Sequence, residues 1–215
     1  MAKSALTFAV ISLLLLHLSF TLVSGLTEIV KTWCIAKPSS SDEILQFNTD
    51  YSCDHANCGP SKIGGPCFNP NALIHHASYG MSAYYQSTAR QAIDCNFKNT
   101  ALIALTDPSS QTCHYPGGET NIDLSETGKW CVAKPTTEKD MLQAIIDFAC
   151  SHVDCSSTKP GGGCLSPTTA VNHASVAMNL YYQAFGDCDF KGTGVIVMSN
   201  PGYDNCKYPY VPHGI

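Results

Sequence analysis

The sequence predicts an α+β fold of two small disulfide-rich domains, each with two main helices packed on a small antiparallel β-sheet. Two observations support this prediction. Twelve cysteines fall into two sets of six, in which the first four recur 97 residues later and the last two recur 93 residues later. Within each set, helical periodicity gives way to short β-rich runs. The chain is therefore a tandem duplication of one small domain.

The N-terminus indicates export from the cell. Lys3 precedes an apolar run over residues 5–23, and small residues follow up to Gly25. This pattern predicts a signal peptide over residues 1–25. An uncleaved membrane anchor is the alternative, because the run approaches the ~20 residues of a membrane span. We expect cleavage, since His17 interrupts the run, and hence no membrane segment in the mature protein.

The charge balance argues against two classes of partner. Without Lys3 the mature chain has 11 Lys and Arg against 17 Asp and Glu. No basic stripe is present, so neither nucleic acid nor an anionic membrane is an expected partner. We expect a secreted monomer of the extracellular space.

The repeat sets the domain boundaries. Residues 32–116 form the first predicted domain and residues 129–210 the second. Residues 117–128 are polar, acidic and bounded by glycines, which predicts a flexible linker. Domains of this size have limited cores, so three disulfides in each would contribute roughly 2–4 kcal/mol apiece.

Each domain contains three predicted elements. In the first copy, Ser40 and Glu43 stand as N-cap and third position of a helix, and Pro70 introduces a second helix. The predicted segments of the first copy are a helix over 41–53, a helix over 71–87 and a β-rich run over 101–105. The corresponding segments of the second copy are 138–150, 168–184 and 194–198.

The second helix of each copy has three stripes at helical spacing. Two of them are apolar or small in both copies, which predicts a core-facing side. The third stripe is polar and is expected to face solvent. It consists of His75, Tyr79, Ser82 and Gln86 in the first copy and of Asn172, Val176, Asn179 and Gln183 in the second.

Several separate motifs occur in one order in both copies. They are WCIAKP at 33–38, GGPCFNPN at 64–71 and HASYGMSAYYQ at 76–86, followed in the second copy by WCVAKP, GGGCLSPTT and HASVAMNLYYQ. With the cysteine spacing, they resemble carbohydrate-binding module family 43 of plants, also called the X8 domain. The resemblance implies a non-catalytic, secreted protein of the extracellular space or cell wall, with plasmodesmata among the locations considered, that binds callose-type β-1,3-glucan. The short polar C-terminus lacks a lipid-anchor signal, so we do not expect the lipid-anchored plasmodesmal form.

The resemblance also implies a disulfide pairing. Spacing alone allows 15 pairings in each repeat. In the family, the first cysteine pairs with the fifth, the second with the third and the fourth with the sixth. The implied bonds are Cys34–Cys95, Cys53–Cys58, Cys67–Cys113, Cys131–Cys188, Cys150–Cys155 and Cys164–Cys206.

Sugar binding requires an exposed aromatic face with polar groups at its rim. Tyr79 is the one aromatic residue on the polar stripe, and Val176 replaces it in the second copy. We therefore expect the first copy to bind glucan more tightly. The predicted glucan-binding residues are Tyr79, His75, Ser82 and Gln86, with Trp33 and Tyr115 as further candidates for which structural packing is the favoured interpretation.

We expect no enzymatic activity, cofactor or metal. Asp50 recurs as Asp147, but neither has the partner carboxylate that a glycosidase requires. His76 recurs as His173, yet cysteines that all pair leave no thiolates for a zinc site. The alternative function is an extracellular structural or signalling protein that binds a protein partner through its disulfide scaffold.

Overall fold

The computed structural model of the protein describes residues 27–124, here called the first repeat, and residues 127–211, the second repeat. The predicted signal peptide lies outside the described residues. The elements in chain order are β1 (Thr27–Ala36), α2 (Asp42–His55), η1 (Gly59–Ser61), α3 (Leu73–Ser87), η2 (Ala92–Cys95), η3 (Phe97–Asn99), β2 (Ala101–Ala104), β3 (Gly118–Asp123), β4 (Trp130–Ala133), α4 (Lys139–Cys150), η4 (Ser156–Thr158), α5 (Ala170–Phe185), η5 (Phe190–Gly192) and β5 (Gly194–Val197).

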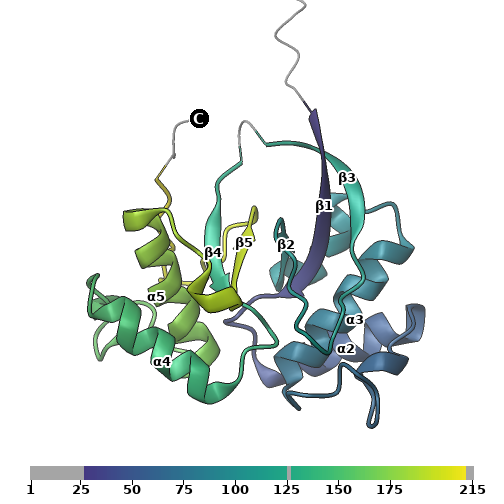
Figure 1. The fold of residues 1–215 in the computed structure, drawn as a ribbon, viewed down its shortest axis with the longest axis horizontal. Helices are drawn as coiled ribbons and strands as arrows, with labels where there is room; N and C mark the ends of the chain where they lie inside the picture. Colours follow the sequence, from purple (N-terminus) through teal and green to yellow (C-terminus); the bar gives the residue numbers. More distant parts are fainter. Residues whose placement is uncertain (1–26, 125–126, 212–215) are drawn as a thin grey trace, which may run out of the picture.

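The predicted α+β fold is confirmed, but the two repeats share one antiparallel sheet with strand order β3-β1-β2-β5-β4. β1 pairs with β2 in the same register as β4 with β5, so that Trp33 faces Ala104 and Trp130 faces Val197. Helices α2 and α3 lie on one side of the shared strands, and α4 and α5 lie on the other (Figure 1).

The junction between the repeats is symmetric. Ala104 and Val197, which are equivalent positions in the duplication, pair with each other across β2 and β5. Leu105 N–H donates to the Ile196 carbonyl at 2.8 Å, and Met198 N–H donates to the Ile103 carbonyl at 3.0 Å. Exchanging the two repeats turns one of these bonds into the other, so the junction has a local pseudo-twofold axis.

One hydrophobic core spans the junction. Its buried members are Trp33, Ile35, Tyr79, Leu102, Ala104 and Tyr115 of the first repeat, Trp130, Val132, Val176, Val195, Val197 and Tyr208 of the second, and disulfide cysteines of both. β2 and β5 are apolar at nearly every position because they lie inside this core. The repeats are therefore not independent domains joined by a tether.

The predicted flexible linker is wrong for much of its length. Gly118–Asp123 forms β3, which pairs with the first half of β1 from Thr27↔Asp123 to Thr32↔Gly118. β3 is polar because it is an edge strand, and its residues alternate between half-buried and exposed. β1 also begins at Thr27, earlier than the predicted domain start at residue 32.

The long helices lie close to their predicted positions. α2 begins one residue later than expected, because Ser41 rather than Ser40 accepts the capping hydrogen bond from Ile44 N–H at 3.4 Å. α5 ends at Gly186, whose φ of 76° lets the chain leave the helix in the left-handed conformation. The C-terminal ends of α3 at Ser87 and of α4 at Cys150 are as predicted, and the remaining helix ends differ from the predicted ones by one or two residues.

All six disulfides implied by the family resemblance are confirmed. Each joins two cysteines of the same repeat, with Cα–Cα separations from 4.5 to 5.7 Å, within the usual range for disulfides. Cys34–Cys95 and Cys131–Cys188 tie each repeat's first long strand to the loop after its second long helix. Within residues 27–124 and 127–211, no helix is long and apolar enough to cross a membrane.

Candidate functional site

The polar stripe of α3 does not face solvent, contrary to the prediction. His75 and Ser82 are fully buried, and Tyr79 is 4% exposed. Gln86 is half-buried. The further candidates Trp33 and Tyr115 are also buried, as their structural interpretation predicted. No flat ring of this group is available for a sugar to stack on.

The stripe is buried because α3 covers one edge of β1. Beyond Thr32, β3 no longer pairs with this edge. Cys34 N–H donates to Ser82 Oγ at 3.3 Å, and Ala36 N–H donates to Ser78 Oγ at 3.0 Å. A helix over a strand edge satisfies groups that would otherwise be unpaired. Polar periodicity therefore reflects hydrogen bonds to a strand here, not contact with water.

The second repeat uses the same arrangement, with Asn179 in place of Ser82. Cys131 N–H donates to Asn179 Oδ1 at 3.2 Å, and Ala133 N–H donates to Ser175 Oγ at 3.1 Å. The equivalent of Gln86 also keeps its function, because the Nε2 of Gln86 donates to the Thr32 carbonyl and that of Gln183 to the Lys129 carbonyl.

His75 belongs to a buried hydrogen-bonded pair. The Tyr115 hydroxyl lies 2.7 Å from His75 Nδ1 and donates to the His75 carbonyl at 3.1 Å. Both contacts are satisfied when Nδ1 carries the proton and donates to the hydroxyl. Burial, with the charge of neighbouring His76, lowers the pKa of His75 to about 4. The pair is structural and lies out of reach of a polymer.

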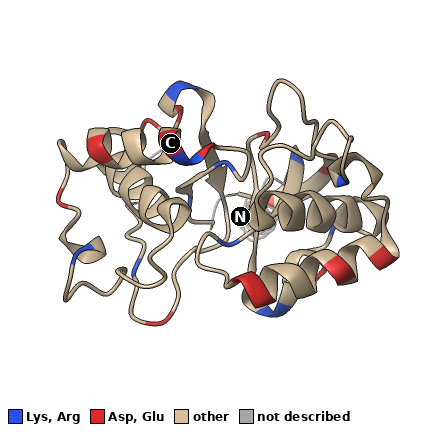
Figure 2. Ribbon diagram, turned by 90° about the horizontal axis from the view of Figure 1, so that it is seen from below, with Lys and Arg blue, Asp and Glu red and all other residues tan. Residues whose placement is uncertain are grey.

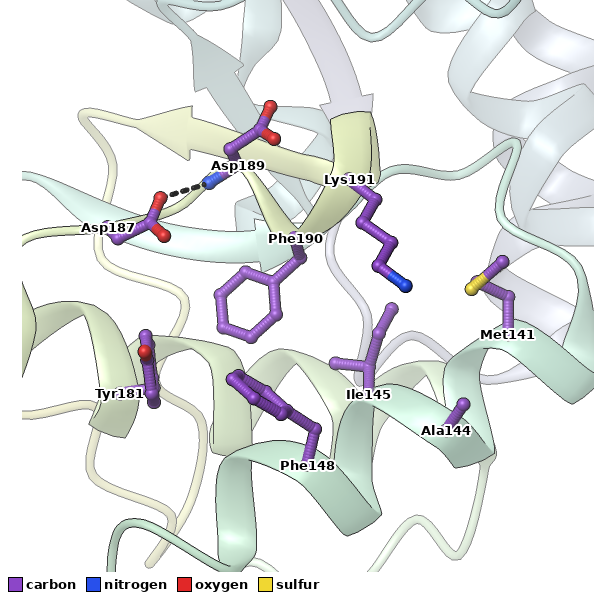
Figure 3. Close-up of a pocket in the computed structure, with 9 residues that line it drawn as sticks. All are labelled: Met141, Ala144, Ile145, Phe148, Tyr181, Asp187, Asp189, Phe190 and Lys191. Carbon is purple, nitrogen blue, oxygen red and sulfur yellow. Dashed lines mark hydrogen bonds between the residues drawn. The ribbon is translucent and has the colours of Figure 1, made fainter.

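Exposed aromatic rings gather instead on the outer side of each helix pair. In the second repeat they line a cavity of about 370 Å³ between α4, α5 and η5 (Figure 3). We call this cavity the second groove. Its lining residues are Met141, Ala144, Ile145, Phe148, Tyr181, Asp187, Asp189, Phe190 and Lys191.

The rings of the second groove form a continuous cluster. The Tyr181 ring lies 5.4 Å from Phe148, 5.3 Å from Phe190 and 4.6 Å from Phe185 between centroids. Phe148 is 47% exposed and Phe185 is 56% exposed, although rings of this size normally bury most of their surface in folded proteins. An exposed aromatic cluster of this kind is a candidate binding site.

Polar groups stand beside these rings. The Asp187 carboxylate accepts a 2.9 Å hydrogen bond from Asp189 N–H, and the Lys191 side chain extends along the groove toward Met141 (Figure 3). Phe190 and Lys191 have φ of 44° and 58°, a conformation that is uncommon for residues other than glycine. Two such residues in succession orient the Phe190 ring toward α4, and strained turns of this kind cluster at functional sites.

The first repeat has the equivalent groove, here called the first groove. Tyr51, Tyr84, Phe97 and Lys98 stand where the second repeat has Phe148, Tyr181, Phe190 and Lys191. Lys98 also has a positive φ, of 54°. The other residues that line its cavities are Glu43, Ile44, Phe47, Asn48, Ile93, Asp94 and Thr100.

The first groove is more subdivided than the second. It consists of two cavities of about 210 and 360 Å³. Lys98 Nζ lies 5.1 Å from the centroid of the Phe47 ring, where the second repeat has only Ala144. The Tyr51 and Tyr84 hydroxyls are 3.3 Å apart, and this hydrogen bond raises the pKa of Tyr84. The second groove is thus a single cavity, whereas the first is divided into two.

A third cavity, of about 520 Å³, lies between β3 and the C-terminal end of α3. Its walls include Arg90, Glu119 and Asn121, whereas its one ring, that of Tyr85, is fully buried. Because β3 belongs to the first repeat only, this cavity is not duplicated. It offers no exposed ring for sugar stacking.

The sequence analysis missed the grooves although a signal was present. The three rings at Tyr51, Tyr84 and Phe97 are aromatic in both copies, whereas Tyr79 is not. Recurrence of an aromatic residue in both copies would have favoured the groove over the stripe. Asp187 and Asp189 are both exposed, and Asn96 stands in the place of Asp189 in the first groove, so the carboxylate pair is not duplicated.

Charges of both signs flank each groove, with Asp187, Asp189 and Lys191 in the second and Glu43, Asp94 and Lys98 in the first. Lys and Arg are scattered among Asp and Glu over both repeats in the described part of the chain, without a continuous basic stripe on the side shown in Figure 2. No three His, Cys, Asp or Glu residues within 27–124 and 127–211 gather closely enough to hold a metal ion. The grooves are therefore suited to an uncharged ligand with a flat apolar face and hydroxyl groups.

Comparison with known proteins adds independent information. The X8 domain matches the chain twice, at residues 32–102 and 129–195. The major pollen allergen Ole e 10 of Olea europaea is 44% identical over 87 residues, which cover 40% of this chain and 71% of the allergen. A glucan endo-1,3-beta-glucosidase of Triticum aestivum is 51% identical over 85 residues, which cover 38% of this chain and 18% of that protein.

A third relative is plasmodesmata callose-binding protein 2 of Arabidopsis thaliana. It is 36% identical over 104 residues, which cover 48% of this chain and 53% of that protein. The chain spans about a fifth to a third of the length of the glucosidases that it matches.

Proposed function

The chain belongs to the X8 domain family, and from this premise we propose that it is a non-catalytic binding protein for β-1,3-glucan of the plant cell wall. The duplicated aromatic groove is the observation that carries the proposal. Each groove offers exposed ring faces beside hydroxyl, carboxylate and ammonium groups, as recognition of an uncharged pyranose requires. The names of the relatives, which include callose-binding proteins and glucan endo-1,3-beta-glucosidases, favour the same ligand class.

The absence of catalysis is part of the proposal. Both matched regions are X8 domains, and no catalytic domain is matched. Hydrolysis requires two carboxyl groups held on either side of the scissile bond. Asp187 and Asp189 stand on one exposed turn, and Asn96 in the first groove cannot replace a carboxylate. Only the second groove has the carboxylate pair, whereas both grooves have the aromatic rings. Hydrolysis by that pair is therefore not the property that the duplication retained.

The proposal places the protein outside the cell as a monomer. Six disulfides persist in an oxidising compartment, in agreement with the predicted signal peptide. The edges of β2 and β5, which a single repeat would expose, pair with each other within the chain. A second molecule is therefore not needed to cover them.

We propose an order of affinity for the two repeats that is opposite to the expected one. The second groove is a single cavity whose Tyr181 ring packs against the additional Phe185 ring, whereas Phe47 and Lys98 line both cavities of the divided first groove. We propose that the second groove binds the glucan more tightly than the first. This replaces the expectation that Tyr79 makes the first repeat the stronger binder.

Calorimetry with a β-1,3-linked hexasaccharide tests the proposal. Phe148→Ala should weaken the tighter site by about thirtyfold, because truncating an anchor aromatic residue commonly costs ~2 kcal/mol of binding free energy. Tyr51→Ala should weaken only the other site. Ile63→Ala is the matched control, since Ile63 is apolar and exposed but lies outside both grooves.

Two further measurements complete the test. Reducing ends should not accumulate when the protein is incubated with β-1,3-glucan, and turnover by homogeneous protein would contradict the non-catalytic assignment. If the folded protein binds no glucan of any linkage, the alternative of an extracellular scaffold for a protein partner becomes the better interpretation.

A further inference from the structure

The repeats are fixed to one another by contacts that occur in equivalent pairs. In addition to the two backbone bonds of the junction, Ile196 N–H donates to Thr106 Oγ1 at 2.9 Å and Ile103 N–H donates to Ser199 Oγ at 3.1 Å. Thr106 and Ser199 are equivalent positions in the duplication. Each repeat thus provides a hydroxyl group that accepts a hydrogen bond from a backbone N–H of the other.

Lysine side chains add a second pair of contacts. Lys134 Nζ donates to the Ser109 carbonyl at 3.0 Å, and its equivalent Lys37 donates to the Gly202 carbonyl at 3.5 Å. Burial lowers the pKa of both lysines. With the core that spans the junction, these contacts hold the repeats in one orientation, because packed interiors do not deform continuously.

The two grooves lie away from this junction. All residues that line the second groove come from α4, α5 and the turn that contains η5, and all residues that line the first groove come from α2, α3 and the η2–η3 segment with Thr100. The helices concerned stand on opposite sides of the shared strands (Figure 1). Neither groove contains a residue of the other repeat.

From this arrangement we propose that the two grooves bind two different glucan chains, so that one molecule cross-links the polymer. A twofold rotation reverses every direction perpendicular to its axis. The two equivalent grooves therefore face in different directions, and a ligand reaches each of them from a different side. A flexible linker would allow the second groove to turn toward the chain already held by the first. The fixed junction removes this freedom, and avidity on one chain is lost when geometry forbids simultaneous engagement.

This inference rests on the proposed function, and a sandwich experiment separates the two. Insoluble β-1,3-glucan particles are saturated with the full-length mature protein and washed. Fluorescent soluble β-1,3-glucan is then added, and the fluorescence retained on the particles is measured. Particles without protein give the background. Calorimetry with the β-1,3-linked hexasaccharide counts the binding sites of each variant in parallel.

The intact protein should show two hexasaccharide sites and should capture the soluble glucan. Tyr51→Ala and Phe148→Ala should each keep one strong site and remain on the particles, while capture falls by about tenfold or more. Ile63→Ala should behave like the intact protein. Circular dichroism and a thiol count confirm that each variant is folded with its disulfides closed.

The remaining outcomes each overturn a defined statement. Two hexasaccharide sites without capture above that of the single-groove variants would overturn cross-linking and leave the proposed function intact. A single site in the intact protein would also overturn cross-linking alone. Absence of hexasaccharide binding would overturn both the proposed function and the inference built on it.

Discussion

In the first repeat, His75 and Tyr115 share a buried hydrogen bond beneath α3, whereas in the second repeat the equivalent residues, Asn172 and Tyr208, make no such bond. Asn172 Nδ2 donates instead to the Tyr203 hydroxyl at 2.7 Å. Within the described residues, the buried Tyr208 hydroxyl has no hydrogen-bond partner. Equivalent buried positions in the two repeats therefore carry different polar residues with different hydrogen-bond partners.

The disulfides and backbone hydrogen bonds that surround these residues form a framework that is the same in both repeats. Both repeats keep three equivalent disulfides and the helix that covers a strand edge. Trp33 Nε1–H donates to the Tyr115 carbonyl at 3.4 Å, and Trp130 Nε1–H donates to the Tyr208 carbonyl at 3.3 Å. These bonds to backbone groups recur in both copies, whereas the side-chain bond between His75 and Tyr115 does not. Backbone partners survive substitution, which explains why the framework tolerates change in its interior.

The largest effect should come from the two tryptophans, which test whether the repeats unfold as one unit. Trp33→Ala and Trp130→Ala should each cost about 3–5 kcal/mol of unfolding free energy, because both side chains lie in the core that spans the junction. The chain has two tryptophans, so the one that remains reports on the opposite repeat. Its fluorescence transition in denaturant should shift together with the circular dichroism. An unshifted fluorescence transition would show that the repeats unfold separately.

The second effect is a pH dependence of the unfolding free energy that comes from His75 in the first repeat and has no counterpart at Asn172 in the second. The pKa of His75 is about 4 in the native protein and near 6.5 in an unfolded chain. Between these values the unfolded chain binds more protons, so the contribution of His75 to stability, about 3 kcal/mol, is present above pH 6.5 and is lost as pH falls toward 4. Denaturant titrations from pH 4 to 7 measure it.

His75→Asn, which places the second repeat's residue in the first, should flatten this slope. His114→Asn, at an exposed position, should leave it unchanged. The groups that contact or influence His75 are the His76 ring, the Cys67 backbone and the Tyr115 hydroxyl, and none of them is altered in these variants. An equal slope in His75→Asn and the parent protein would assign the pH dependence to other groups.

The smallest effect compares the two equivalent tyrosines. Tyr115→Phe should cost about 1–3 kcal/mol, because it leaves His75 Nδ1 and the His75 carbonyl without their partner. Tyr208→Phe should change stability by less than ~0.5 kcal/mol or stabilise the protein, because it removes a buried hydroxyl that has no partner among the described residues. Melting temperatures of the two variants give the comparison directly, and equal losses would show that the Tyr208 hydroxyl is bonded after all.

The features that could be predicted from the sequence are those set by local spacing. The repeat followed from the cysteines, and the long helices followed from apolar periodicity and proline. The disulfide pairing came from the family resemblance alone. The environment of His75, Tyr79 and Ser82 could not be predicted, because a side chain that bonds to a strand edge has the same polarity as one that faces water.

The junction was missed for a different reason. Ala101–Leu105 contains no polar residue, although a strand with one face on a small core should alternate. The continuous apolar run was compatible with burial on both faces, but nothing local identifies the neighbour that buries the second face. β3 was missed because an edge strand and a linker can share a polar composition.

The pseudo-twofold junction has a further consequence for the history of the chain. An interface that maps onto itself when the two partners exchange is one that two copies of a single sequence can form without modification. The tandem protein thus has the geometry of a homodimer whose subunits have been fused. Fusion makes such an association independent of protein concentration. It also allows each half to change alone, and the divergence of His75 and Asn172 at equivalent positions is a change that no homodimer could make in one subunit only.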